Sequence, residues 1–275
     1  KCDTAQSQNN ADDITNTVDA SLTAFTSDGF TIATMSTDPI GNKNGNQFAT
    51  WMWKANGGTT ASNSDGSITS TVQVNSTAKF SIVTYTGTGS NATIGHGLGV
   101  APKFIMIKRL NATEQWQVGH FSKTTNANPE TDYLEFTTSG TADNVNRWND
   151  TLPTTSVVSL GTHAGLNASG SSYVAYCFAE NKGFSAMGAY TGMTDNADGS
   201  MIYTGFRPSM LIIKRTDGNE SWQVSDIARG KIEKDGSEGT RGNTSEYKIR
   251  IEDASAENST SGDLDIYSTG FKLRD

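Results

Sequence analysis

The chain has 275 residues, of which 28 are Gly, 5 are Pro and 18% are charged, and its polar residues are mainly Asn, Ser and Thr. This composition excludes collagen, which needs Gly at every third position, and helical bundles, which are rich in Ala, Glu, Lys and Leu. The net charge of −8 and pI near 4.9 argue against nucleic-acid binding, because an acidic surface repels phosphate. The apolar runs are shorter than the ~20 residues of a membrane helix, so we expect no membrane insertion.

Residues 1–57 are interpreted as the back half of one β module. A strand-like block, Phe48–Ala55 (FATWMWKA), follows the turn-rich stretch 41–46 and recurs as Tyr173–Glu180 (YVAYCFAE) after a similar stretch. The chain begins with Lys1 rather than Met, so we expect either processing of its start or a fragment of a longer protein. The next stretch, 58–79, is rich in Gly, Asn, Ser and Thr and is expected to be a polar connector.

Residues 80–183 are expected to form a complete β module. Residues 80–85 alternate apolar and polar residues as a half-buried strand does, whereas 104–107 are apolar on both faces and predict a strand buried between layers. Residues 116–118 follow a turn-prone interval and predict a hairpin with 104–107. Cys177 lies in an alternating strand pattern and is expected to be a small buried hydrophobe.

Residues 184–275 are expected to be a second copy that lacks its last strand. Pro102–Arg109 is answered by Pro208–Arg215, and Trp116 by Trp222, with every pair 106 residues apart (214 − 108 = 106). The fold class is therefore predicted to be all-β, with tandem β-sandwich or jelly-roll-like modules of about 100 residues. We expect separate cores, with the ends of the chain truncated or completed by a partner.

No catalytic constellation is expected. His96, His120 and His163 lack partners at metal-ligand spacing; the counterpart of the segment 95–99 around His96 is Tyr203-Thr204-Gly205, without a His, and His120 becomes Asp226. The segment 95–99 is rich in Gly but precedes a strand rather than a helix, which favours a tight turn over a phosphate loop. The carboxylate pairs at 12–13 and 263–265 lie in polar stretches, which disfavours a polysaccharide depolymerase. We predict a non-enzymatic protein with no metal and no cofactor.

Two groups of residues remain as candidates for binding. The basic pairs 108–109 and 214–215 each end a buried strand, and either grip an acidic ligand or mark where a strand leaves the core. Trp148 lies in the polar sequence NRWN, where it is either a platform that stacks on a sugar ring or a side chain that pins a loop onto the sandwich. Trp116 and Trp222 occupy equivalent alternating positions and are expected in the core.

Long stretches of the sequence resemble a repeated β module of uncharacterised function from large tail-associated and fibre-like proteins of marine tailed bacteriophages. The matching residues cover about 27–275, and the motifs that carry the resemblance are Tyr85–Gly87, Gly97–Lys103, Ile107–Arg109, Trp116, Tyr173–Glu180 and Tyr203–Pro208. The resemblance implies no catalytic residues.

The same resemblance implies a virion structural protein, a tail fibre or another adsorption component that binds the host surface. Its expected partners are other virion or tail proteins, copies of itself and a host surface glycan, and its expected location is the extracellular virion. The alternative function is a secreted or cell-surface carbohydrate-binding β-sandwich module, with a site near Trp148, or an extracellular filament subunit.

Overall fold

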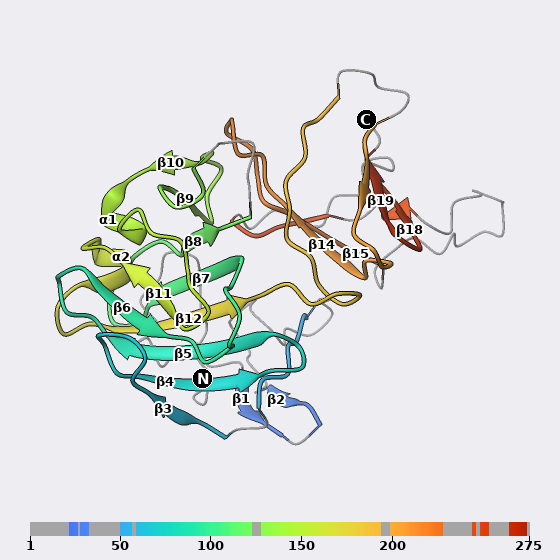
Figure 1. The fold of residues 1–275 in the computed structure, drawn as a ribbon. Coiled ribbons are helices and arrows are strands. Elements are labelled where there is room, and N and C mark those ends of the chain that lie inside the picture. Colours follow the sequence, from blue (N-terminus) through green and yellow to red (C-terminus); the bar gives the residue numbers. More distant parts are fainter. Residues whose placement is uncertain are drawn as a thin grey trace.

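The computed structural model of the protein describes residues 22–26, 28–32, 50–56, 59–122, 128–193, 199–227, 244–245, 248–252 and 264–273. Within these ranges the chain consists mainly of antiparallel strands and connecting loops, and its two helices, α1 (Val145–Trp148) and α2 (Ala164–Asn167), are single turns (Figure 1). Neither helix of the described chain has the length or the apolar sequence to cross a membrane. The predicted all-β fold class is confirmed.

One antiparallel sheet of eight strands forms the larger part of the protein, in the order β10-β9-β8-β7-β12-β5-β4-β3. Its strands are β3 (Ala61–Asn63), β4 (Ser70–Asn75), β5 (Phe80–Thr86), β7 (Phe104–Arg109), β8 (Gln117–His120), β9 (Asp132–Glu135), β10 (Ala142–Asp143) and β12 (Ser172–Phe178). β12 lies between β5 and β7, and its Phe178 is paired with Phe80 on one side and Phe104 on the other. β12, the last strand of this sheet in sequence, therefore lies inside the sheet and joins its two parts.

A second, two-stranded layer covers one face of this sheet. β6 (Ala92–Gly95) pairs with β11 (Val157–Leu160), with Ile94 opposite Val158. Ile94 and Leu160 from this layer and Val83 and Ala175 from the large sheet are fully buried in one hydrophobic cluster. This packing of two antiparallel layers around a shared core is the predicted β-sandwich.

The predicted strand faces are confirmed in this sandwich. Ile105 and Ile107 of β7 are fully buried in the main core, and Phe104 and Met106 pack against a second cluster on the opposite face. β7 pairs with β8 as the predicted hairpin, with Met106 opposite Val118. Cys177 is fully buried, and burial raises the pKa of its thiol to about 12. An apolar run on both faces thus identified a strand between two layers.

The C-terminal part of the chain contains two smaller antiparallel sheets. Their strands are β13 (Met201–Tyr203), β14 (Met210–Ile213), β15 (Gln223–Asp226), β16 (Thr244–Ser245), β17 (Ile249–Arg250), β18 (Leu264–Tyr267) and β19 (Gly270–Leu273). One sheet has the order β13-β19-β18-β16 and the other β14-β15-β17. Leu264, Ile266 and Phe271 are buried between these elements, with Leu211 and Ile213 of β14 packed against them. These strands form a small core of their own.

A hairpin near the N-terminus has a counterpart near the end of the described chain. β1 (Leu22–Phe25) and β2 (Phe30–Ile32) form an antiparallel pair around the turn at Asp28 and Gly29. β18 and β19 form the corresponding hairpin around the similar sequence STGF at 268–271. Both copies of this short sequence therefore connect two paired strands.

The expected connector at 58–79 is wrong, because this stretch contributes β3 and β4 to the large sheet. β4 pairs with β5 along its length, and its Val72 is buried in the main core together with Ile68 just before it. The Ser and Thr residues before Val72 hide the alternation of inward and outward side chains in the sequence. Ser70 is buried like Val72, and its hydroxyl donates to the Gly95 carbonyl at 2.8 Å. The sheet of the complete module therefore begins at β3.

The expectation of separate cores holds for the small core of the C-terminal sheets, but a further hydrophobic cluster is shared by the two copies. Trp222, which follows β14 in the second copy, is 3% exposed and packs in one cluster with Val118, Leu134 and Phe136 of the first. Its indole Nε1 donates to the Glu135 carbonyl of β9 at 2.8 Å. The two copies share this cluster, so a substitution there acts on both.

Candidate functional site

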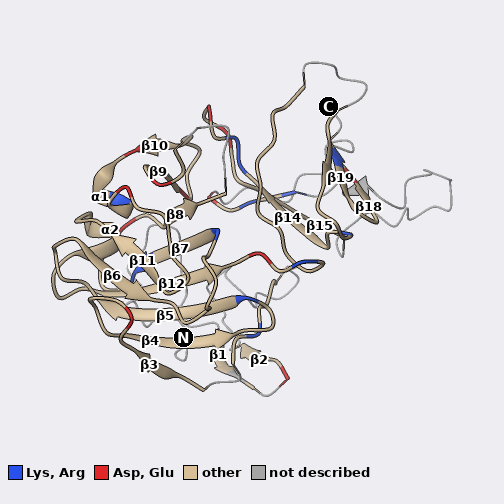
Figure 2. Cartoon of the chain, in the orientation of Figure 1, with Lys and Arg blue, Asp and Glu red and all other residues tan. Residues whose placement is uncertain are grey.

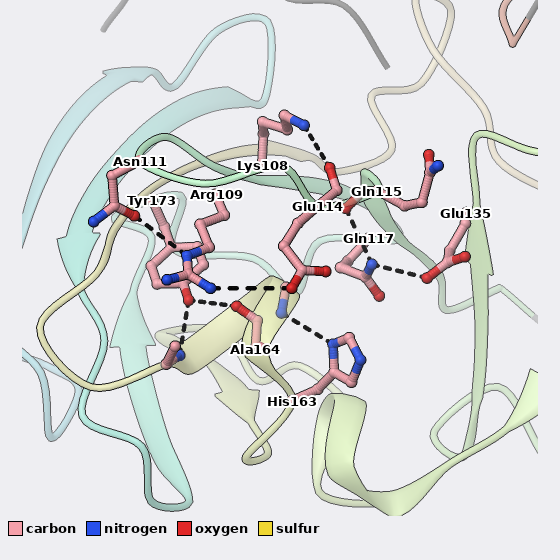
Figure 3. Close-up of polar contacts among 12 residues, drawn as sticks. Lys108, Arg109, Asn111, Glu114, Gln115, Gln117, Glu135, His163, Ala164 and Tyr173 are labelled. Atoms are coloured by element: carbon pink, nitrogen blue, oxygen red, sulfur yellow. Dashed lines mark hydrogen bonds and ion pairs between the residues drawn. The ribbon is translucent and has the colours of Figure 1, made fainter. Parts of the chain in front are cut away.

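Lys108 and Arg109, at the end of β7, both fold back onto the β7–β8 loop (Figure 3). The buried Lys108 Nζ donates to the Glu114 carbonyl at 2.5 Å. Arg109 donates from Nε to the Asn111 side chain at 3.2 Å, and its Nη1 lies 4.0 Å from a carboxylate oxygen of Glu114. We call this arrangement the Lys–Arg clasp. Its cations are used to hold a loop, which favours the structural interpretation of the pair over the grip on an acidic ligand.

The Lys–Arg clasp recurs on the β14–β15 hairpin. Lys214 Nζ donates to the Glu220 carbonyl and also, at 2.8 Å, to the Thr138 carbonyl. Arg215 lies 2.8 Å from Asp217 through Nε and 3.8 Å from Glu220 through Nη1. The contact with Arg215 lowers the pKa of the Asp217 carboxyl, and burial lowers the pKa of Lys214. The duplicated sequence therefore keeps the same internal contacts in both copies.

A buried polar cluster lies beside the first clasp, and its members come from different elements. Arg147 of α1 bonds to Glu135 of β9 at 3.2 Å, and its guanidinium lies 4.0 Å above the centre of the Tyr133 ring. Gln117 of β8 donates to the same carboxylate at 2.9 Å (Figure 3). Arg147 also contacts His163. The partly buried Glu135 carboxylate thus accepts from both Gln117 and Arg147 at the same oxygen.

His163 is the N-cap of α2, and this role decides its chemistry. Its Nδ1 accepts the backbone N–H of Gly165 at 3.0 Å, which satisfies one of the free donors at the start of the helical turn. Burial and the neighbouring Arg147 lower the pKa of His163 to about 4, so the ring is neutral at physiological pH. A ring nitrogen held in this way caps a helix and is not presented to a substrate.

Two tyrosines attach α2 to the large sheet. Tyr85 of β5 and Tyr173 of β12 stack with their ring centres 5.1 Å apart. The Tyr85 hydroxyl donates to the Leu166 carbonyl at 2.7 Å. The Tyr173 hydroxyl donates to the Ala164 carbonyl at 2.6 Å (Figure 3). These bonds hold α2, and with it the capping residue His163, against the large sheet.

The other histidines occupy structural positions. His96 is fully buried, accepts the Leu98 N–H at Nδ1, and lies 3.2 Å from the Thr154 carbonyl through Nε2. Burial lowers the pKa of His96 and of the half-buried His120. Among the residues that the structure describes, no group of three or more His, Cys, Asp or Glu side chains is placed to hold a metal ion. Asp12, Asp13 and Asp263 of the two carboxylate pairs lie outside the described residues.

The segment 95–99 forms a turn between two strands, as expected. Gly97 and Gly99 both have φ of +69°, the left-handed region that favours glycine, and β7 follows instead of a helix. A Cβ on Gly97 would also lie 2.9 Å from a methyl group of Val74. The glycines serve backbone geometry at this turn.

Trp148 is not an exposed platform, so its interpretation as a sugar-stacking residue is wrong. The side chain is 1% exposed and belongs to the main core, where it makes an edge contact with Phe121 at 5.4 Å between ring centres. Gly119 leaves room for both rings, because a Cβ there would lie 2.5 Å from Phe121 and 3.0 Å from Trp148. The alternative interpretation, a side chain that pins a loop onto the sandwich, describes what is observed.

The sequence did not identify the cluster around Glu135, Arg147 and His163. These residues lie in unrelated local patterns, and only the folding of α1 and α2 against β9 brings them together. The Asn-capped turn at Asn144, whose side chain accepts from the Asn146 N–H at 2.9 Å, is the one local signal that a short helix begins beside Arg147.

Charges of both signs are scattered over the described chain, with Lys and Arg residues interspersed with Asp and Glu (Figure 2). The family model of a domain of unknown function (DUF7483) matches residues 2–275, almost the whole chain. The chain belongs to this family. No curated protein and no solved structure matches it. The family therefore covers both copies of the repeat and the N-terminal segment as one unit.

Proposed function

We propose that the protein is a non-catalytic virion structural protein of a tailed bacteriophage, either a tail fibre or another adsorption component that binds the host surface. One observation carries the proposal: the duplicated hairpins keep the Lys–Arg clasp, whereas the residues 106 positions after His96 and His120 are Ile202 and Asp226. Duplication that retains loop-shaping contacts but not the histidines is expected of an architectural protein.

The resemblance to β modules of marine phage tail-associated proteins supports the same proposal. A β-sandwich with internally bonded hairpin loops suits a part that must keep its shape outside a cell. The proposed partners are other tail proteins and further copies of this chain, and the proposed site of action is the extracellular particle. Attachment to a host glycan is included, although Trp148 is not the contact.

Localisation on particles tests the proposal. Antibodies raised against the full chain are applied with gold labels to purified phage particles, and the particle proteins are identified in parallel by mass spectrometry. We expect label on the tail or its fibres, and loss of that label when the antibody is first absorbed with the pure protein. Absence of the chain from purified particles overturns the proposal.

The alternative of a secreted carbohydrate-binding module loses its candidate site, since Trp148 is buried. A glycan array with the full chain still distinguishes the two functions when it is combined with localisation. Glycan binding by a protein that is absent from particles supports the alternative. Glycan binding by a particle protein supports the adsorption component.

A further inference from the structure

The sheet β13-β19-β18-β16 has one face in a core and the other face outside it. Ile202, Phe271 and Ile266 are paired across its first three strands and lie in or against the small C-terminal core. Side chains alternate between the two faces of a strand, so the neighbouring positions point outward. The exposed residues of this outer face are Met201, Tyr203 and Tyr267. In Figure 1, β18 and β19 lie at the end of the molecule away from the large sheet.

Two tyrosines flank a glycine on this outer face. Gly270 of β19 is paired with Tyr203 of β13 on one side and with Tyr267 of β18 on the other. Residues paired in this way lie on the same face of a sheet, and the two tyrosines are two strand spacings apart, about 9.5 Å. A Cβ on Gly270 would collide with the Ile202 carbonyl, so glycine is required here. No side chain from β19 therefore separates the two rings. We call the surface around Tyr203, Gly270 and Tyr267 the tyrosine face.

Both tyrosine rings are laid along the sheet. The Tyr267 hydroxyl donates to the carboxylate of Asp265, two residues earlier on the same strand, at 3.3 Å. The Tyr203 ring extends toward Gly205, two residues later, where a Cβ would lie 3.7 Å from its hydroxyl and 3.8 Å from Cε1. Each ring therefore presents its side to solvent, and not its hydroxyl alone. Such a surface can stack on another ring.

The charges beside the rings have opposite signs. Lys272 of β19 is paired with Asp265 of β18 on one side and with Met201 of β13 on the other. One cation and one anion in register leave this row of the outer face without net charge, although the whole chain carries −8. The tyrosine face is thus suited to an uncharged ligand that combines apolar surface with hydroxyl groups. A sugar ring has both, since C–H groups cover its faces and hydroxyls surround its edge.

The fold does not require a tyrosine at position 203. The residue 106 positions earlier is Gly97, with φ of +69° and no room for a side chain, because a Cβ would lie 2.9 Å from a methyl group of Val74. Tyr203 is 76% exposed, more than any other large apolar or aromatic side chain of the described chain. A ring that remains in solvent contributes little to a core, and exposed aromatic surface of this kind marks a binding site.

We propose that the tyrosine face binds an uncharged glycan, with one sugar ring stacked on Tyr203 and another on Tyr267. The hydrogen bond to Asp265 holds the Tyr267 ring in place, and Gly270 leaves the path between the two rings open. The glycan chain crosses β19 from one tyrosine to the other. The assignment of this glycan to a host surface rests on the proposed adsorption role, whereas the binding site itself rests on the geometry of the sheet.

The first test measures glycan binding by the full chain. An array of neutral and anionic bacterial surface polysaccharides is probed with the native chain, with Tyr203→Ala and with Phe184→Ala, a control at another exposed aromatic residue. We expect the native chain and Phe184→Ala to bind neutral glycans equally, and Tyr203→Ala to bind them about tenfold more weakly. Absence of binding by the native chain, a preference for anionic glycans, or equal binding by Tyr203→Ala overturns the proposal.

The second test separates stacking from other contacts. Tyr203→Phe keeps the ring and removes the hydroxyl, so it is expected to retain most of the affinity. A loss as large as that of Tyr203→Ala shows that the ring does not carry the binding and overturns the stacked arrangement. Sedimentation velocity of the same variants tests a second copy as the occupant. If Tyr203→Ala abolishes self-association and leaves glycan binding unchanged, the face belongs to a second copy and the proposal is wrong.

Localisation on particles keeps this inference distinct from the proposed function. A chain that is present on particles and binds glycans independently of Tyr203 overturns the glycan site and leaves the virion role in place. A chain that is absent from particles and binds neutral glycans through Tyr203 overturns the virion role and supports the glycan site.

Discussion

Trp148 illustrates how burial decides the role of an aromatic side chain. Its polar neighbours in sequence suggested exposure, but the ring fills the core beside Phe121. We expect Trp148→Ala to lower the free energy of unfolding by about 3–5 kcal/mol, the usual cost of deleting a large buried aromatic. Trp53→Ala, at a 44% exposed position, is the control and should cost much less. Urea unfolding measures both, and equal effects would contradict the burial of Trp148.

His163 gives the protein a predictable loss of stability in mild acid. Burial and Arg147 lower the pKa of the folded ring to about 4 from its ordinary value of 6.5. Between pH 6.5 and 4 the unfolded chain therefore binds more protons at this residue than the folded chain, so stability falls as the pH falls through that window and levels off below it. Because the ring is only half-buried, we expect a contribution of about 1–2 kcal/mol after solvent screening.

His163→Asn isolates this contribution. Asn is a good N-cap and retains an acceptor for the Gly165 N–H, but it does not titrate in this range. His96 and His120 are present in both proteins, so their effects cancel in the difference. Unfolding free energies measured from pH 7.5 to 4 should fall more steeply for the native chain than for His163→Asn. Parallel curves would show that His163 does not carry the effect.

At the scale of an element, the two copies of the Lys–Arg clasp form a natural matched pair. Lys108 is fully buried and Lys214 is partly exposed, although both donate to the corresponding Glu carbonyl. We expect Lys108→Met to cost about 1–3 kcal/mol, because the Glu114 carbonyl loses its donor inside the protein. Lys214→Met should cost less, since water replaces the donor at an exposed loop. Urea unfolding of both variants tests this order, and a larger cost at 214 would contradict it.

The strands with strong apolar patterns were predictable from the sequence. β5, β7 and β12 carry alternating or continuous apolar runs, and β8 follows a turn-prone interval after β7. The repeat of Pro102–Arg109 and Trp116 set the equivalents of β7 and β8 in the second copy. β4 was missed because only two of its six residues, Val72 and Val74, are apolar and because the stretch around it is rich in Gly, Asn, Ser and Thr. Ser70 is buried in this strand and bonds to the Gly95 carbonyl, so an inward position of β4 gives no apolar signal in the sequence.

The polar cluster was not predictable in the same way. Glu135, Arg147 and His163 are contributed by β9, α1 and the start of α2, and none of these elements has a repeat or a periodic pattern that points to the other two. The cluster depends on tertiary contacts formed only when α1 and α2 settle against the sheet. The Lys–Arg pairs were found in the sequence, because duplication marked them, but their partners in the loop required the structure.

At the scale of the whole molecule, duplication explains both the common and the differing features of the two copies. The β7–β8 hairpin and its counterpart β14–β15 are alike, whereas β7 lies inside a sheet of eight strands and β14 at the edge of a sheet of three described strands. The second copy also packs on the first through Trp222, whose Nε1 donates to the Glu135 carbonyl. This contact joins the two copies.

The shared cluster leads to a prediction about cooperativity. Trp222 packs edge-on to Phe136 with ring centres 5.2 Å apart, and Trp116 contacts Phe136 in the same cluster from the other copy. Because Trp222 is buried by residues of the first copy, Trp222→Ala should lower the stability of both copies, by about 3–5 kcal/mol at the Trp222 site itself.

We expect calorimetry to show a transition that shifts to lower temperature with Trp222→Ala. The same transition should shift by a smaller amount with Trp116→Ala, because Trp116 is half-buried. The control is Tyr203→Ala, at a 76% exposed position of the second copy, which should leave the transition temperature nearly unchanged. Two transitions, of which Trp222→Ala moves only one, would show that the copies unfold independently despite the shared cluster.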